Sequence, residues 1–252
     1  LMSSTSFRSQ QLTLLKPNSP PTNLKTMKTP IKDPNSFFCS QTIKEIMPPN
    51  SKIKSLLLFS GQLEFPLAFS GHDVEIATNK YVIYEFWNCA LRDPYLVAKM
   101  TESLHNDVGP QFVYVLQNEW PKFKDPYFRS ALFYLLNHYS FSGTVSHGEF
   151  NTSNYSPLSG RSLVNFFENH DIDKLKIKYY NNESWEDALE FIEPDEVLFL
   201  PIGKLSLSPL NNSTFDGHEQ YNINNRKIKQ LIENYDKKFI MVYKSHPNIF
   251  NQ

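Results

Sequence analysis

Glycines are the residues to examine first for nucleotide chemistry, because phosphate-binding turns need backbone that approaches the ligand closely. The chain has eight glycines, and no two of them are separated by a single residue, so no G-x-G dinucleotide turn exists. Gly143 and Gly148 have the spacing of a P-loop, but Glu149 and Phe150 follow where that motif needs Lys and Ser or Thr. A glutamate there would repel phosphate. Both common nucleotide-binding motifs are therefore excluded.

Nucleophiles and metal ligands form no recognisable arrangement either. The two cysteines, Cys39 and Cys89, have neither a metal-ligand spacing nor a disulfide framework, so we expect a reducing compartment and no metal. A G-x-S-x-G nucleophile turn is absent from the sequence. His138, in a helical segment, and His147, in a turn, are more typical of surface positions than of catalytic bases. The sequence therefore does not indicate a hydrolase.

Composition predicts a globular chain without a strong electric field. The 252 residues have a mass of 29.4 kDa and are 40% hydrophobic, which is enough for a core. Basic and acidic residues nearly cancel, at 25 against 26, so strong autonomous binding to nucleic acid is not expected. The longest apolar runs are far shorter than the roughly 20 residues of a membrane span. We expect a cytoplasmic or virion-associated protein that is neither secreted nor membrane-bound.

Hydrophobic periodicity predicts the elements that must position any site. From residue 34 onward, segments with helical spacing alternate with short strand-like runs, which indicates an α/β sandwich with a mostly parallel sheet. The predicted strands are Ser55–Phe59, Val74–Thr78, Lys174–Tyr180, Glu196–Leu200 and Lys238–Tyr243. The predicted helices are Phe38–Met47, Leu63–Phe69, Lys80–Leu91, one opened by Asp93-Pro94, one running from Asp125-Pro126 to about Asn137, Arg161–His170, Trp185–Phe191 and His218–Tyr235.

Composition shifts divide the chain into three parts. The first 32 residues contain no acid, and they carry five basic residues and four prolines, so residues 1–31 are predicted to be a disordered or draped arm. Residues 32–103 and 159–252 hold the alternating helices and strands of the α/β core. Residues 104–158, rich in aromatic residues, are predicted to be an inserted subdomain with one clear helix.

The stretch Lys124–Asn151 carries the most specific family signal. It reads "KDPYFRSALFYLLNHYSFSGTVSHGEFN", which is similar to a long helix, an N-x-x-x-F-x-G turn and a G-x-F-N hairpin end. The matching positions are Asn137, Phe141, Gly143, Gly148, Phe150 and Asn151. With further fragments in the same order, the chain resembles the Dam-like, D12-class DNA adenine-N6 methyltransferases. The resemblance implies a Rossmann-like class I methyltransferase core, and S-adenosylmethionine as the cofactor of an active member.

The cofactor motifs implied by this resemblance are degenerate. In the amino-terminal motif Lys32 remains, but Asn35–Phe37 replaces Gly-Gly-Lys. Gly61 survives after the first strand, but Leu57 takes the place of an acid, and the turn is crowded by Gln62, Leu63 and Glu64. Ala77 stands where the family has an acid for the ribose hydroxyls, and it cannot accept a hydrogen bond. The remnants of a cofactor site would be Lys32, Gly61 and Asn79.

The active-site tetrapeptide is lost more completely. The family ends a strand with D-P-P-Y, whose Asp polarises the adenine amino group and whose Tyr stacks on the flipped base. This chain has Leu200, Pro201, Ile202 and Gly203 at those positions. Leucine has no acceptor and glycine has no ring. The resemblance therefore predicts a catalytically degenerate member.

Recognition of duplex DNA is predicted to be weak. The hairpin between Gly143 and Gly148 holds Thr144–His147 and has no fixed positive charge for phosphate or guanine. The family pattern leaves Asn137, His147 and Asn151 as the DNA-contacting candidates.

Three functions remain open from the sequence. The first is a non-catalytic binding or structural subunit, of phage or viral origin, that has a protein partner and no cofactor. The second is a diverged but active S-adenosylmethionine-dependent adenine methyltransferase, with candidates Lys32, Gly61, Asn79, Pro201 and Asp216. The third is a nucleic-acid-binding protein without catalysis, which would use the basic arm and the insertion.

Overall fold

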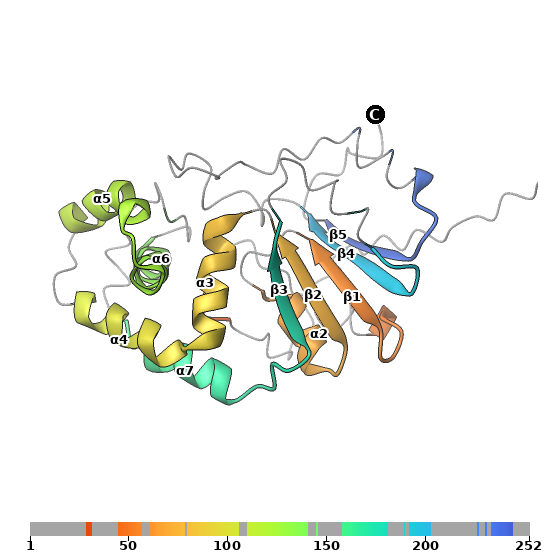
Figure 1. The fold of residues 1–252 in the computed structure, drawn as a ribbon, viewed down its shortest axis with the longest axis horizontal. Helices are drawn as coiled ribbons and strands as arrows, with labels where there is room; N and C mark the ends of the chain where they lie inside the picture. Colours follow the sequence, from red (N-terminus) through yellow and green to blue (C-terminus); the bar gives the residue numbers. More distant parts are fainter. Residues whose placement is uncertain are drawn as a thin grey trace, which may run out of the picture.

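The structure is a computed structural model, shown in Figure 1. It describes residues 29–31, 45–56, 61–78, 80–105, 110–140, 145, 158–180, 189, 192–202, 226, 230 and 233–243. Statements below refer to these residues. Lys32, Asn79, His147, Asn151, Gly203 and Asp216 lie outside them.

A five-stranded parallel sheet forms the centre of the fold (Figure 1). Its strands are β1 (Lys52–Leu56), β2 (Asp73–Thr78), β3 (Leu175–Tyr179), β4 (Glu196–Ile202) and β5 (Phe239–Tyr243). They lie in the order β3-β2-β1-β4-β5, and every neighbouring pair is parallel. The predicted α/β class with a mostly parallel sheet is confirmed, and the strand order matches that of a Rossmann-like sheet.

Helices flank the sheet and form a helical block beside it (Figure 1). The helices are α2 (Glu64–Phe69), α3 (Tyr81–Arg92), α4 (Pro94–His105), α5 (Pro110–Glu119), the 3₁₀ turn η1 (Trp120–Lys122), α6 (Pro126–Tyr139) and α7 (Arg161–Glu168). We call α4, α5, η1 and α6 the helical block. None of the described helices combines the length and apolar character needed to cross a bilayer.

Helix α3 joins the sheet to the helical block. Its residues Val82, Phe86 and Ala90 recur at i, i+4 and i+8 and are almost fully buried, which is the apolar stripe of an amphipathic helix. The Phe86 ring lies 5.1 Å from the Phe133 ring of α6. Helix α4 also packs closely against the start of α7. A Cβ on Gly160 would come within 2.6 Å of the Ala98 Cβ in α4, so this close approach depends on glycine.

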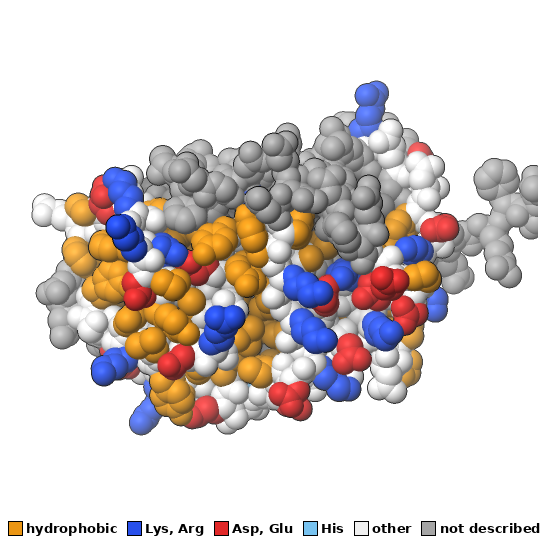
Figure 2. Space-filling view, in the orientation of Figure 1, with side chains coloured by type: hydrophobic (Ala, Val, Ile, Leu, Met, Phe, Trp, Pro, Cys, Tyr) orange, Lys and Arg blue, Asp and Glu red, His pale blue; other side chains and the backbone are white. Residues whose placement is uncertain are grey.

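Charges follow the strands on one face of the sheet. Lys52 and Lys54 alternate with apolar residues in β1, and Glu75 lies beside Lys54 in β2. Glu75 accepts hydrogen bonds from Lys54 and from Lys178, the latter at 2.6 Å, and Lys52 pairs with Asp195 at 2.5 Å. Figure 2 shows charged side chains gathered over the strands and hydrophobic ones over the helical side. The charges on neighbouring strands compensate one another, and the paired side chains of Lys54 and Glu75 are largely buried.

The structure differs from the prediction at strand β1 of the sheet and at helix α5 of the helical block. β1 begins at Lys52 rather than at Ser55, because Lys52 and Lys54 alternate with apolar residues and extend the strand backwards. Helix α5 was not predicted: Val113 is buried, but Tyr114 and Val115 are more than half exposed and blur the helical pattern. Its signal was Pro110, a residue favoured at the first helical position.

The amino-terminal prediction also differs at its boundary. Ile31, which the sequence assigns to the arm, is fully buried and belongs to the hydrophobic core. Thr29 is also buried, and its hydroxyl donates to the Ile31 carbonyl oxygen at 3.3 Å. The packed part of the chain therefore already includes residues 29–31. The predicted helix Trp185–Phe191 lies outside the described residues except for Leu189.

Candidate functional site

The strand order identifies one edge of the sheet as the place to look for a ligand. From β1 the chain proceeds to β2 and β3 on one side, and it returns to β4 and β5 on the other. In open α/β sheets, ligands bind outside the carboxyl ends of the strands at this reversal. Here the reversal lies between β1, which ends at Leu56, and β4, which ends at Ile202. We call this region the carboxyl edge.

The turn after β1 is occupied by an aromatic ring. Gly61 has φ of 71°, a left-handed conformation that favours glycine, and its carbonyl oxygen accepts from Phe65 N at 3.0 Å. A Cβ on Gly61 would lie 2.8 Å from the Phe65 ring. That ring is fully buried and packs edge-on against Trp87, with centroids 4.7 Å apart. The retained glycine therefore accommodates a side chain of the protein itself.

Aliphatic side chains lie at or near the carboxyl ends of the three central strands. Leu56 of β1 and Leu200 of β4 are fully buried, and Ala77 of β2 is 8% exposed. Leu56 is adjacent to Ala77 in the register of the sheet. None of these three side chains can accept or donate a hydrogen bond. The predicted losses at positions 77 and 200 thus lie at one edge, in a densely packed environment.

A buried carboxylate at this edge was not singled out by the sequence. Glu64, the first residue of α2, is 3% exposed, and its Oε1 accepts a hydrogen bond from Ser55 Oγ at 3.3 Å. From the sequence, Glu64 was expected only to crowd the turn after β1. The available signal was an acid flanked by Leu63 and Phe65 in a run of buried apolar residues. Of the acidic side chains that the structure describes at the carboxyl edge, Glu64 is the best placed to take part in chemistry.

The neighbouring end of β2 is closed by polar backbone contacts and by tyrosines. Thr78 Oγ1 accepts from Lys80 N at 3.1 Å, and the Thr78 carbonyl oxygen accepts from Tyr180 N at 3.1 Å. The rings of Tyr81 and Tyr179 meet edge-on, with centroids 5.4 Å apart. Burial, and then the charge of Glu85, raises the pKa of Tyr81 above its ordinary value.

The remaining site residues that the sequence predicts and the structure describes lie in two different elements, β4 and α6. Pro201 and Ile202 continue β4 beyond Leu200, as the strand boundaries require. Asn137, proposed to contact DNA, lies in α6 at 1% exposure. The side chain of Asn137 is therefore part of the packed block, and its contact with DNA stays a prediction. Only Gly61, Leu200, Pro201 and Ile202 of the predicted set are brought to the carboxyl edge within the described residues.

Other chemical groups of the described residues do not assemble into a centre. Among these residues, no three His, Cys, Asp or Glu side chains are grouped so as to hold a metal ion. Cys89 is buried in α3, and burial raises the pKa of its thiol, which keeps it in the unreactive protonated form.

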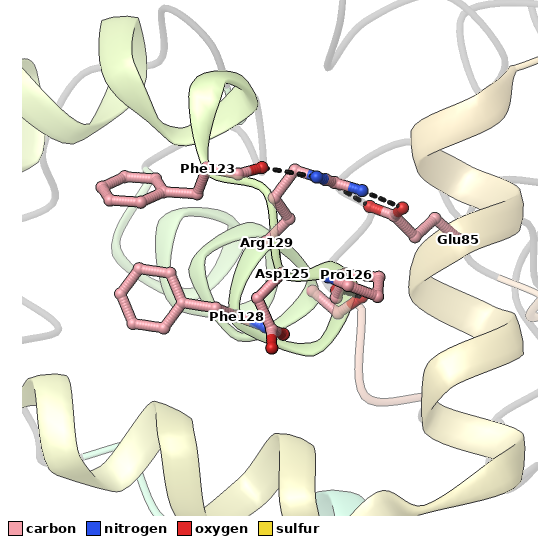
Figure 3. Close-up of polar contacts among 7 residues, drawn as sticks. Glu85, Phe123, Asp125, Pro126, Phe128 and Arg129 are labelled. Carbon is pink, nitrogen blue, oxygen red and sulfur yellow. Dashed lines mark hydrogen bonds and ion pairs between the residues drawn. The ribbon is translucent and has the colours of Figure 1, made fainter.

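A buried ion pair lies between α3 and α6. Arg129 Nε donates to Glu85 Oε1 at 2.7 Å, and Nη2 donates to Oε2 of the same carboxylate. Arg129 Nη1 also donates to the Phe123 carbonyl oxygen (Figure 3). The two side chains are 12% and 5% exposed. We call this contact the α3–α6 junction.

The junction also fixes the turn that leads into α6. Asp125 caps the helix by accepting from Phe128 N at 2.8 Å, and Pro126 follows at its first position. Figure 3 shows the rings of Phe123 and Phe128 on the side away from Glu85. A side-chain cap and a shared guanidinium therefore set the position of this turn.

Comparisons with known proteins add no relative: no family model matches the chain, and no curated protein sequence matches it.

Proposed function

We propose that this protein is a catalytically degenerate relative of the DNA adenine-N6 methyltransferases that acts as a non-catalytic binding or structural subunit. The observation that carries the proposal is the packing of the carboxyl edge. Leu56, Phe65 and Leu200 are fully buried there, where a methyl donor and a purine would have to be placed.

The chemistry of methyl transfer supports this proposal. An adenine amino group must be polarised by an acceptor before it can attack a methyl group, and Leu200 offers none. A missing acceptor against a buried donor costs about 1–3 kcal/mol. A base also gains about 1–3 kcal/mol by stacking on an aromatic ring, which the sequence lacks at Gly203. Together these losses correspond to several powers of ten in rate.

A protein partner fits this role better than duplex DNA does. The formal net charge is −1, so the chain has no overall attraction for phosphate. The settings that we propose are an inactive partner of a catalytic methyltransferase, or a structural component of a phage or virus. In either setting the protein would reside in the cytoplasm or in the virion.

Transfer of a radiolabelled methyl group from S-adenosylmethionine to duplex DNA tests the proposal. Purified full-length protein should incorporate no label above a blank without protein, because Leu200 offers no acceptor for the adenine amine. Label on adenine above that blank would overturn the proposal. A second test is size-exclusion chromatography of the protein isolated from its natural source. A larger complex is expected, and a monomer without a co-purifying partner would count against the subunit role.

An active but diverged methyltransferase is the second candidate, and Glu64 is the observation that favours it. This carboxyl group is buried at the carboxyl edge and accepts a hydrogen bond from Ser55, so the edge retains one acidic side chain. If Glu64 replaced the missing acid, Glu64→Gln would abolish methylation while leaving the fold intact. Under the first proposal the unmodified protein has no activity to abolish, so the same assay separates the two candidates.

A further inference from the structure

We draw no further inference here: the strongest candidate, the exposed apolar surface of the helical block where Tyr95, Tyr114, Val115 and Phe123 reach solvent, carries none because nothing in the structure shows what covers it.

Discussion

The carboxyl edge and the α3–α6 junction use buried space in opposite ways. At the edge, Leu56, Phe65 and Leu200 fill the interior with carbon. Glu64 accepts a hydrogen bond from Ser55 there at 3.3 Å. At the junction, Arg129 holds a carboxylate with two nitrogens and a backbone carbonyl with a third. A buried guanidinium thus joins two helices at the junction, whereas apolar side chains dominate the edge.

This difference indicates that the buried polar residues of the junction have a structural role. A buried ion pair that is complete in its hydrogen bonds can fix the relative register of the elements that it joins. Carbon at the ends of parallel strands stabilises the sheet but offers nothing to a polar cofactor. The comparison thus shows a carboxyl edge whose described side chains are packed as core.

Breaking the junction should have the largest effect. Glu85→Ala leaves the Arg129 charge buried and unpaired, which should lower the free energy of unfolding by about 3–5 kcal/mol in denaturant titrations. The control is Glu119→Ala, which removes the exposed pair of Glu119 and Lys122 at 2.8 Å and should cost less than about 1 kcal/mol. The double variant Glu85→Met/Arg129→Met should recover most of the loss. Equal losses for Glu85→Ala and Glu119→Ala would contradict the structural role of the junction.

Truncating Leu200 should show that the edge is core. Leu200→Ala removes a fully buried side chain and should destabilise the protein by about 2–5 kcal/mol, as measured by thermal or denaturant unfolding. Val115→Ala is the matched control, since Val115 is 58% exposed and its truncation should change stability by no more than about 0.5 kcal/mol. A Leu200→Ala variant as stable as the parent would mean that the edge contains open space.

Substituting Gly61 separates backbone strain from collision with the Phe65 ring. Gly61→Ala combines a φ of 71° with a Cβ 2.8 Å from that ring, and it should cost about 1–3 kcal/mol. Gly71→Ala is the control, because its φ is 95° and a Cβ there meets nothing within 4 Å. The control introduces backbone strain but no collision, so Gly61→Ala should be the more destabilising of the two. The reverse order would show that Phe65 does not occupy the turn.

Alkaline pH should produce the smallest effect, through Tyr235 beside β5. Burial, and then the charge of Asp236, raises the pKa of Tyr235 from 10.0 to about 12. Between these values the unfolded chain ionises while the folded chain keeps its proton, so stability falls as pH rises. Tyr235→Phe should flatten this fall in unfolding midpoints measured from pH 9 to 12. An unchanged slope in the variant would assign the pH dependence to other groups.

Sequence patterns were sufficient for most of the sheet and its helices. Alternation and helical spacing identified β2, α3, α6 and α7 within one or two residues, because each has an apolar stripe or a strong cap such as Asp125. Helix α5 was not predicted because its apolar residues Tyr114 and Val115 are exposed, so its hydrophobic residues do not form a single buried stripe. The start of β1 was not predicted because the apolar run that follows Lys54 is a stronger signal than the alternation of Lys52 and Lys54 with apolar residues before it.

The contacts at the candidate site could not be read from the sequence. Spacing shows that an acid is absent at position 200, but it does not show that Leu200 is fully buried. The Glu64 and Ser55 side chains meet only because α2 packs back against the sheet, and Arg129 meets Glu85 across 44 positions of the chain. Such contacts depend on how the elements pack in three dimensions, which local periodicity does not determine.

Calorimetric titration of the full-length protein with S-adenosylmethionine tests the central claim most directly. A carboxyl edge filled by Leu56, Phe65 and Leu200 should give no saturable heat up to about 1 mM ligand, which corresponds to less than about 4 kcal/mol of binding free energy. Saturable binding with a dissociation constant of about 1 μM would mean that the edge opens to the cofactor, and it would contradict the account.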